Sequence, residues 1–262
     1  MIIDSHAHVV LPNERQIEWM EEAQIDKTVL FTSVVHPEKA SSLMEFKKEM
    51  GMLYDIINGI KNPIEERLKA IEELKSAIKE NPQRYIGFGS IPTGLSYEEN
   101  LSWIEKYIVK NNFYGIGKLT PNSGQVELLE PLFQASRSTG NLPLWVHTFF
   151  PLVVQDIKTL LELAKRYPSV PLILGHMGGI HWLDTLVACK ELSNVYIDLS
   201  ATFTTLALEF AIREFPERVL FSSDAPYTSP LSAKINIEIL IKDKGLCQQV
   251  LGGNIANLLQ LC

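Results

Sequence analysis

Short apolar segments rich in β-branched residues recur along the chain, and this feature constrains the fold more than any other. Several of them, such as Thr-Val-Leu-Phe-Thr at 28–32 and Pro-Leu-Ile-Leu-Gly at 171–175, are apolar on both faces. Strands of a parallel sheet that is covered by helices have this pattern. The sequence therefore predicts eight parallel strands, at Ile2–Asp4, Thr28–Ser33, Tyr85–Ile91, Gly115–Leu119, Leu144–His147, Leu172–Gly175, Val195–Leu199 and Val219–Ser223.

Segments with helical periodicity lie between these strands. The clearest is Val153–Tyr167, whose apolar residues form one stripe. It is expected to end there because a residue before proline disfavours the helical conformation. Asn254 is predicted to be the N-cap of a last helix, after a tight turn at Gly252-Gly253. Further helices are predicted at Tyr97–Lys110, Leu128–Ser138 and Thr202–Glu214.

Eight strand–helix units within 262 residues predict an α/β protein with a (β/α)8, or TIM, barrel. No linker or low-complexity run divides the chain, so residues 1–262 are expected to form one domain. The spacing is irregular only between the second and third strands. This helical excursion, residues 36–82, is predicted to hold more than one helix, including Pro63–Glu80, and to cap the active-site face.

The charge balance argues against polyanionic partners. With 24 Lys and Arg against 31 Asp and Glu, the net charge is −7, and we expect no broad binding to nucleic acid or acidic membranes. We expect a small-molecule substrate and leave a homo-oligomer open. The 3 cysteines lack CxxC spacing, which indicates a reducing cytoplasm. The N-terminus does not resemble a signal peptide, and the apolar run Leu142–Val154 is too short and interrupted to span a membrane.

Five ionisable side chains follow the apolar strands, at the ends where active sites of such barrels lie. His6 and His8 share one face of the first strand because strand side chains alternate. His147, His176 and Asp224 are each the first strongly polar residue after a later strand. Buried ionisable groups need partners, and a shared divalent cation supplies one. Imidazoles and a carboxylate suit zinc, so we predict a zinc site; the alternative for the first two histidines is a hydrogen-bonded pair near the surface.

Five motifs mark these positions and the C-terminus: Asp4-Ser-His6-Ala-His8, His147, Gly175-His176-Met-Gly-Gly, Ser223-Asp224 and Leu-Gly-Gly-Asn-Ile-Ala-Asn-Leu-Leu. Their order resembles the amidohydrolase superfamily, and most closely its amidohydrolase-related branch, which includes aminocarboxymuconate semialdehyde decarboxylase. The resemblance extends from residue 4 to about residue 260. It is specific for the superfamily and does not name a substrate.

The resemblance implies a role for each of the five residues. His6, His8, His147 and Asp224 would bind one zinc ion, and His176 would act beside it as an acid/base or electrophile. The metal would lower the pKa of its water to about 7. Asp224 would take the water proton, and a protonated His176 would polarise a substrate carbonyl. The sequence leaves open an exchange of roles between His147 and His176.

Lys118 ends the fourth strand. At this position binuclear members of the superfamily carry a carboxylated lysine or a glutamate that bridges two metal ions. In that arrangement His147 and His176 would hold the second ion. Alternatively, Lys118 is cationic and either binds a substrate carboxylate or pairs with Asp224.

Two further residues are predicted to bind substrate. His36 follows the second strand, close to Lys39, although a surface loop is the alternative for this histidine. Tyr227 follows Asp224-Ala-Pro and is expected to line the pocket. Asp198, on the seventh strand, is predicted to be a structural hydrogen-bond acceptor.

Three functions fit these residues. The first is a hydrolase that uses zinc-activated water on a small amide, ester or lactone, and the alternative is a zinc-dependent non-oxidative decarboxylase of an unsaturated or aromatic acid. A barrel that binds metal without catalysis is the third. A decarboxylase needs a cationic clamp for the departing carboxylate, and the sequence places only Lys118, Lys39 and His36 near the mouth. Arg15 and Arg67 do not directly follow the first two strands, so we expect hydrolysis.

Overall fold

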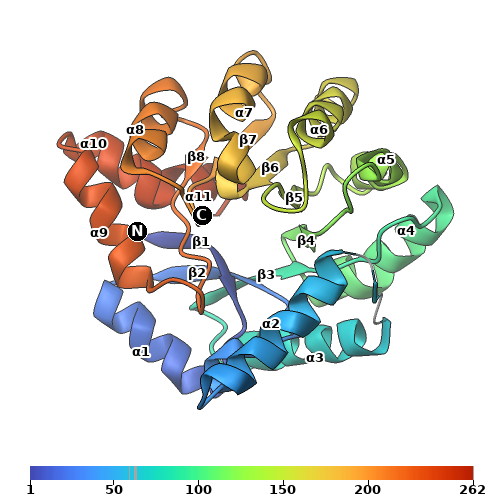
Figure 1. The fold of residues 1–262 in the computed structure, drawn as a ribbon, viewed down its shortest axis with the longest axis horizontal. Coiled ribbons are helices and arrows are strands. Elements are labelled where there is room, and N and C mark those ends of the chain that lie inside the picture. The colour runs from blue at the N-terminus through green and yellow to red at the C-terminus, as the bar shows by residue number, and fades with distance from the viewer. Residues whose placement is uncertain (59, 62–63, 262) are drawn as a thin grey trace.

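The computed structural model describes residues 1–58, 60–61 and 64–261. Eight strands form one sheet in chain order, each parallel to the next, and helices surround them (Figure 1). The strands are β1 (Ile3–His8), β2 (Lys27–Phe31), β3 (Tyr85–Gly89), β4 (Gly115–Leu119), β5 (Leu144–His147), β6 (Leu172–Gly175), β7 (Val195–Asp198) and β8 (Val219–Leu220). The predicted (β/α)8 barrel is confirmed.

The barrel closes through residues that follow β8. The Ser5 amide donates to the Phe221 carbonyl over 2.8 Å, and the His8 amide donates to the Ala225 carbonyl over 2.7 Å. The Asp224 amide also donates to a carbonyl of β1, that of His6, over 2.7 Å. Asp224 is therefore fixed against β1, on which two of the candidate metal ligands lie.

The helices follow the strands in the expected alternation. They are α1 (Asn13–Ala23), α2 (Leu43–Ile57), α3 (Ile64–Glu80), α4 (Tyr97–Trp103), α5 (Glu130–Ser138), α6 (Val154–Arg166), α7 (Trp182–Cys189), α8 (Thr205–Glu214), α9 (Pro230–Leu240), α10 (Lys244–Gln248) and α11 (Asn254–Leu258). After α4, a π-helical turn at Ile104–Ile108 and a 3-10 turn at Val109–Asn111 continue the helix predicted at Tyr97–Lys110. Among the described residues, no helix combines the length and the apolar character needed to cross a bilayer.

The apolar residues form two packed groups, one inside the barrel and one between the strands and the outer helices. Trp145 and Phe31 fill the interior, and Ile255 and Leu259 of the C-terminal segment pack against the same group. Gly175 is required beside the indole, because a Cβ built on it would lie 2.1 Å from the Trp145 ring.

The N-cap predicted at Asn254 is wrong. The helix runs without a break from α10 through a π-helical turn into α11, so the two glycines before Asn254 are helical. A Cβ on Gly252 would lie 2.3 Å from the Met1 carbonyl oxygen, which explains the glycine by close packing. The Asn254 side-chain amide instead donates to the carbonyls of Pro216 and Val219, over 2.8 and 2.7 Å.

The excursion at 36–82 divides into two parts. Helix α3 packs against β3 and buries an apolar face in the core, so it is the barrel helix between β2 and β3. Helix α2 is mostly exposed, and Ile57 is its buried residue. Pro63, where the helix Pro63–Glu80 was predicted to begin, and Cys262 lie outside the described residues.

Candidate metal centre

Three of the five predicted residues converge on one point at the carboxyl end of β1. Nε2 of His6 and Nε2 of His8 lie 3.1 and 3.3 Å from Oδ1 of Asp224. All three side chains are buried, and these atoms have no hydrogen-bond partner within the described part of the chain. Ligand atoms bound to one ion at about 2.1 Å lie roughly 3 to 3.5 Å apart. The spacing therefore fits a shared divalent cation.

The second ring nitrogen of each β1 histidine has an acceptor. Nδ1 of His6 lies 3.0 Å from Oδ2 of Asp198, and Nδ1 of His8 lies 3.4 Å from the Thr32 carbonyl oxygen. A proton on Nδ1 leaves the lone pair on Nε2, and such outer partners commonly orient metal-binding histidines. The protein therefore presents both Nε2 atoms as ligands.

His147 lies beside this group rather than within it. Its Nε2 donates to the Phe150 carbonyl over 3.0 Å, and its buried Nδ1 has no partner among the described residues. Among the described residues, the group that contains Asp224 and whose ligand atoms lie within 4.8 Å of one another is His6, His8 and Asp224, without His147. His147 has the same pattern as the two β1 histidines, with one nitrogen bonded and the other free for a metal.

His176 has a different environment. Its Nδ1 lies 2.8 Å from Oγ of Ser200, and Ser200 in turn donates a hydrogen bond to Asp198. The His147 and His176 rings are 4.9 Å apart between centroids.

Asp198 has the contacts expected of a structural acceptor. Both of its carboxylate oxygens accept hydrogen bonds, and one of them accepts a bond from the Trp145 indole over 2.9 Å. His6, His176 and Asp198 are a second group with metal-like spacing, but its carboxylate is already occupied.

Burial sets the protonation of the centre. Desolvation lowers the pKa of His8 to about 4 and that of His176 to about 3, and it lowers the pKa of His147 well below its usual value. Burial alone would raise the pKa of Asp224, but Lys118 and neighbouring histidines hold it well below its usual range. Neutral imidazoles and an ionised carboxylate are the forms that bind metals. These surroundings favour the neutral ring of His176, and its role as a protonated electrophile stays a prediction.

Lys118 reaches the same point from β4. Its Nζ lies 3.8 Å from Oδ1 of Asp224 and 5.3 Å from the centre of the Trp145 ring. This distance corresponds to the predicted ion pair with Asp224. Carboxylation of Lys118 and a second metal ion stay predictions.

The largest cavity beside the centre has a volume of about 420 Å³. Lys118 and Tyr227 line it together with three of the five predicted residues, and Tyr227 stands edge-on to His8 with 5.9 Å between ring centroids. Apart from Ala201, the rest of its wall consists of apolar and aromatic side chains from α2 and from the loop after β5: Met50, Leu53, Tyr54, Ile57, Phe149 and Phe150.

A smaller cavity, of about 70 Å³, adjoins the large one beneath α2. Lys118 and Tyr227 line both cavities, and Arg67 of α3 lines the smaller one. The expectation that only Lys118, Lys39 and His36 provide cationic groups near the mouth is therefore wrong. The position of Arg67 had a sequence signal, because this residue precedes the buried Ala70 and Leu74 at helical spacing and so shares their face.

His36 is not brought to the metal centre. Its ring nitrogens lie 3.0 Å from Glu38 and 3.2 Å from Glu73, and its backbone amide donates to Glu49 over 3.1 Å. It lines neither of the two cavities at the centre. The histidine instead links the start of the excursion to α2 and α3.

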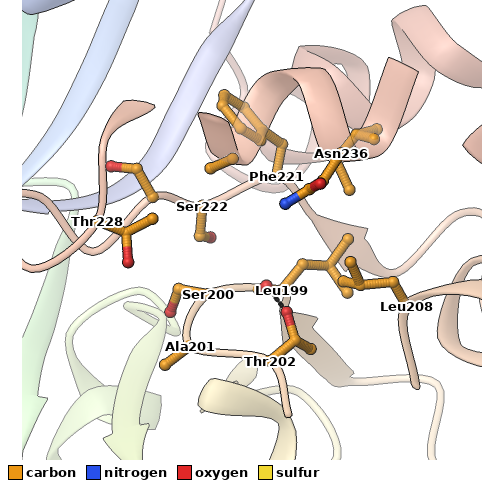
Figure 2. A pocket seen from close by; sticks show the side chains of 12 residues that line it. Leu199, Ser200, Ala201, Thr202, Leu208, Phe221, Ser222, Thr228 and Asn236 are labelled. Carbon is orange, nitrogen blue, oxygen red and sulfur yellow. Dashed lines mark hydrogen bonds between the residues drawn. The ribbon is translucent and has the colours of Figure 1, made fainter. Parts of the chain in front are cut away.

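A third cavity, of about 150 Å³, lies between the loops that follow β7 and β8 (Figure 2). Its wall includes Ser200 and Ser223, and Thr202 closes one side through a hydrogen bond to the Leu199 carbonyl over 3.0 Å. None of its 12 lining residues is ionisable. This cavity therefore lacks acid, base or metal-binding groups, and the chemistry is concentrated in the two cavities at His8 and Asp224.

Comparisons with known proteins agree with this architecture. One similar solved structure is a putative amidohydrolase from Staphylococcus aureus, with 17% identity, a TM-score of 0.73 and 99% of each chain covered. A second is a dihydroxybenzoic acid decarboxylase from Polaromonas sp. JS666 with bound manganese and the inhibitor 2-nitroresorcinol, with 18% identity, a TM-score of 0.72, and 99% of this chain and 97% of that chain covered. A third is 5-carboxyvanillate decarboxylase from Sphingomonas paucimobilis, with 14% identity, a TM-score of 0.68, and 100% of this chain and 99% of that chain covered. Identities this low establish the shared fold alone.

The sequence itself identifies the family. No significant match is found among curated proteins. A family model described as Amidohydrolase matches residues 3–261, which is nearly the whole chain and includes all five predicted site residues. The protein belongs to this amidohydrolase family.

Proposed function

We propose that the protein is a metal-dependent, non-oxidative decarboxylase of aromatic or unsaturated carboxylic acids. The observation that carries this proposal is that two of the candidate metal ligands, His147 and Asp224, lie with His176 in the wall of an aromatic-lined cavity that also holds Lys118. Its volume of about 420 Å³ suits a small planar molecule. A ring would contact the apolar wall, while a carboxylate would meet the cationic and metal-binding groups. Decarboxylases of aromatic acids with the same fold support this choice over hydrolysis.

Four atoms are assigned to the metal: Nε2 of His6, Nε2 of His8, Nδ1 of His147 and Oδ1 of Asp224. Each is buried without a hydrogen-bond partner in the described residues, and each becomes satisfied on binding a cation. A bound divalent ion would supply a Lewis acid that orients and polarises the substrate oxygens. Three imidazoles and one carboxylate favour zinc. Manganese is the alternative metal, because it is bound in the similar decarboxylase from Polaromonas sp. JS666.

His176 is assigned the proton transfer. The Ser200 hydroxyl donates its hydrogen to Asp198, so its oxygen accepts from Nδ1 of His176 and Nε2 is left as the exchangeable position. In decarboxylation the carbon–carbon bond breaks, carbon dioxide leaves, and the electron pair left on the substrate carbon takes up a proton. His176 would take this proton from solvent and deliver it to that carbon.

The excursion at 36–82 is proposed to cap the site. Met50, Leu53, Tyr54 and Ile57 of α2 contribute to the wall of the large cavity, opposite the metal ligands in the barrel. An apolar cover excludes water, which strengthens the electrostatic interactions inside and limits hydrolytic side reactions. The proposed partner is therefore a small molecule, and a homo-oligomer stays a prediction.

The expectation of hydrolysis rested on the lack of an arginine near the mouth. Arg67 in the smaller cavity removes that argument. The same metal ligands would also suit a hydrolase, so the test must measure both reactions.

Product analysis with the metal-loaded enzyme tests the proposal. Hydroxybenzoic acids should release carbon dioxide and the matching phenol, whereas esters and lactones should remain intact. His176→Asn should lower kcat by about 10²–10⁴ with metal content unchanged. Hydrolysis of an ester or lactone with no carbon dioxide from any acid would replace the proposal with the hydrolase. If the metal-loaded protein catalyses neither reaction, a barrel that binds metal without catalysis is the function that remains.

A further inference from the structure

The smaller cavity beneath α2 has a composition that the proposed reaction does not explain. It is continuous with the lining of the large cavity through Leu53, Ile57, Lys118 and Tyr227. Its volume of about 70 Å³ is too small for an aromatic ring and suits a substituent of a few atoms. A group bound here would be attached to a molecule in the large cavity.

Arg67 is a cation without a counter-ion in the described structure. Its Nε is buried and has no hydrogen-bond partner, and no described carboxylate forms an ion pair with it. Desolvation alone lowers the pKa of its guanidinium to about 10. Helix α3 is rich in glutamate, yet none of its described glutamates forms an ion pair with Arg67. A buried charge is costly unless it is paired, so Arg67 has the properties of a group that awaits an anion.

Ser90 provides a second unused donor in the same wall. It is 3% exposed, and its Oγ has no partner among the described residues. Lys118 lines the same cavity as a further cation, whereas none of the lining residues is Asp or Glu. A guanidinium, an ammonium and a hydroxyl around a small space are complementary to a carboxylate.

We propose that Arg67 and Ser90 form a subsite for a second anionic group of the substrate, of carboxylate size. This inference rests on the proposed function, and it names the substrate class as an aromatic or unsaturated acid with two acidic groups. The group that leaves would be held at the metal centre, close to His176. The other would enter the smaller cavity and fix the direction in which the ring lies.

Calorimetric binding to the metal-loaded protein tests the subsite without requiring turnover. The probes are benzene-1,3-dicarboxylate, its neutral-ended analogue 3-carbamoylbenzoate, and benzoate. The wild-type protein should bind the dicarboxylate at least 10-fold more tightly than the amide. Arg67→Met should abolish this preference, Ser90→Ala should reduce it, and Arg67→Lys should restore part of it. Arg213→Met removes an exposed arginine and should leave the preference unchanged.

The thermal stability of the ligand-free variant separates a binding role from a structural one. Arg67 is half-buried and unpaired among the described residues, so its removal should leave the Tm of Arg67→Met unchanged or higher. The dicarboxylate should raise the Tm of the wild type more than that of the variant. Equal affinities for dicarboxylate and amide, no measurable dicarboxylate binding, or an unchanged preference in a folded Arg67→Met protein would each overturn the subsite. Selective binding without carbon dioxide release would uphold the subsite and reject the decarboxylase.

Discussion

Nδ1 of His6 on β1 lies 3.0 Å from Oδ2 of Asp198, which ends β7, a strand separated from β1 in the closed barrel by β8. The carboxylate holds the proton of the imidazole on Nδ1 and thereby directs the Nε2 lone pair toward Asp224. A residue outside the assigned ligands therefore sets the orientation of one of them.

Asp198→Asn is expected to weaken metal binding by about 10- to 100-fold, because the neutral amide no longer holds the tautomer and orientation of His6. Competition with a chelator of known affinity would measure the change. Asp184→Asn, an exposed position on α7, is the matched control. An unchanged metal Kd in the Asp198 variant would show that this carboxylate does not support the centre.

Replacement of the assigned ligands should remove the metal. His8→Ala and Asp224→Ala proteins should retain less than about a tenth of the wild-type metal after dialysis, because each loses one donor of a four-ligand set. Elemental analysis with intact mass would give the stoichiometry and the state of Lys118. His181→Ala, a histidine outside the assigned set, should keep its full metal content. Two ions per chain together with a carboxylated lysine would instead establish the binuclear arrangement.

The contacts of His36 predict a pH-dependent stability. The hydrogen bond with Glu38 raises the pKa of His36 above its ordinary value of 6.5, so this contribution is complete below pH 6.5 and is lost as the pH rises through the raised value. Burial opposes ionisation of Glu38, but the hydrogen bond from His36 lowers its pKa below 4.5, so the pair also weakens in acid. Glu73, Glu49 and Lys39 complete the charged surroundings.

Denaturant unfolding of wild type and His36→Gln from pH 4 to 9 would measure this dependence. The variant should be less stable by about 1 kcal/mol between pH 5 and 6, and the difference should shrink toward pH 9. A difference that stays constant over the whole range would mean that the charge of His36 contributes nothing.

The packing of Gly175 against Trp145 predicts a large effect on stability. Gly175→Ala places a methyl group 2.1 Å from the indole and should destabilise the fold by about 1–3 kcal/mol. Gly51→Ala is a useful contrast, because a Cβ at this position on α2 meets no atom within 4 Å. It should stabilise the protein by about 0.5–1 kcal/mol through helix propensity. Similar effects of the two variants on urea unfolding would contradict this packing.

Local sequence patterns were sufficient for the barrel and for much of its centre. An apolar strand in a parallel sheet ends at the active-site face, so the first polar residue after it is placed by the strand alone. This reasoning brought His6, His8 and Asp224 together correctly, because each needs only its own strand and the barrel closure. The capping pattern failed at Asn254, where a good N-cap residue lies inside a continuous helix and the preceding Gly252 packs against Met1.

The sequence by itself determined the eight strands and the polar groups at their ends, since both depend on periodicity over a few residues. The tertiary structure decided which ring nitrogens are left free, that His36 binds glutamates, and that Arg67 and Ser90 line one cavity. The free ring nitrogens depend on partners from other strands and loops, such as Asp198 and Phe150, and the other two outcomes depend on how α2 and α3 are placed on the barrel. Side chains from distant parts of the chain bring these groups together by packing, and a local pattern gives at most the helix face on which a residue such as Arg67 lies.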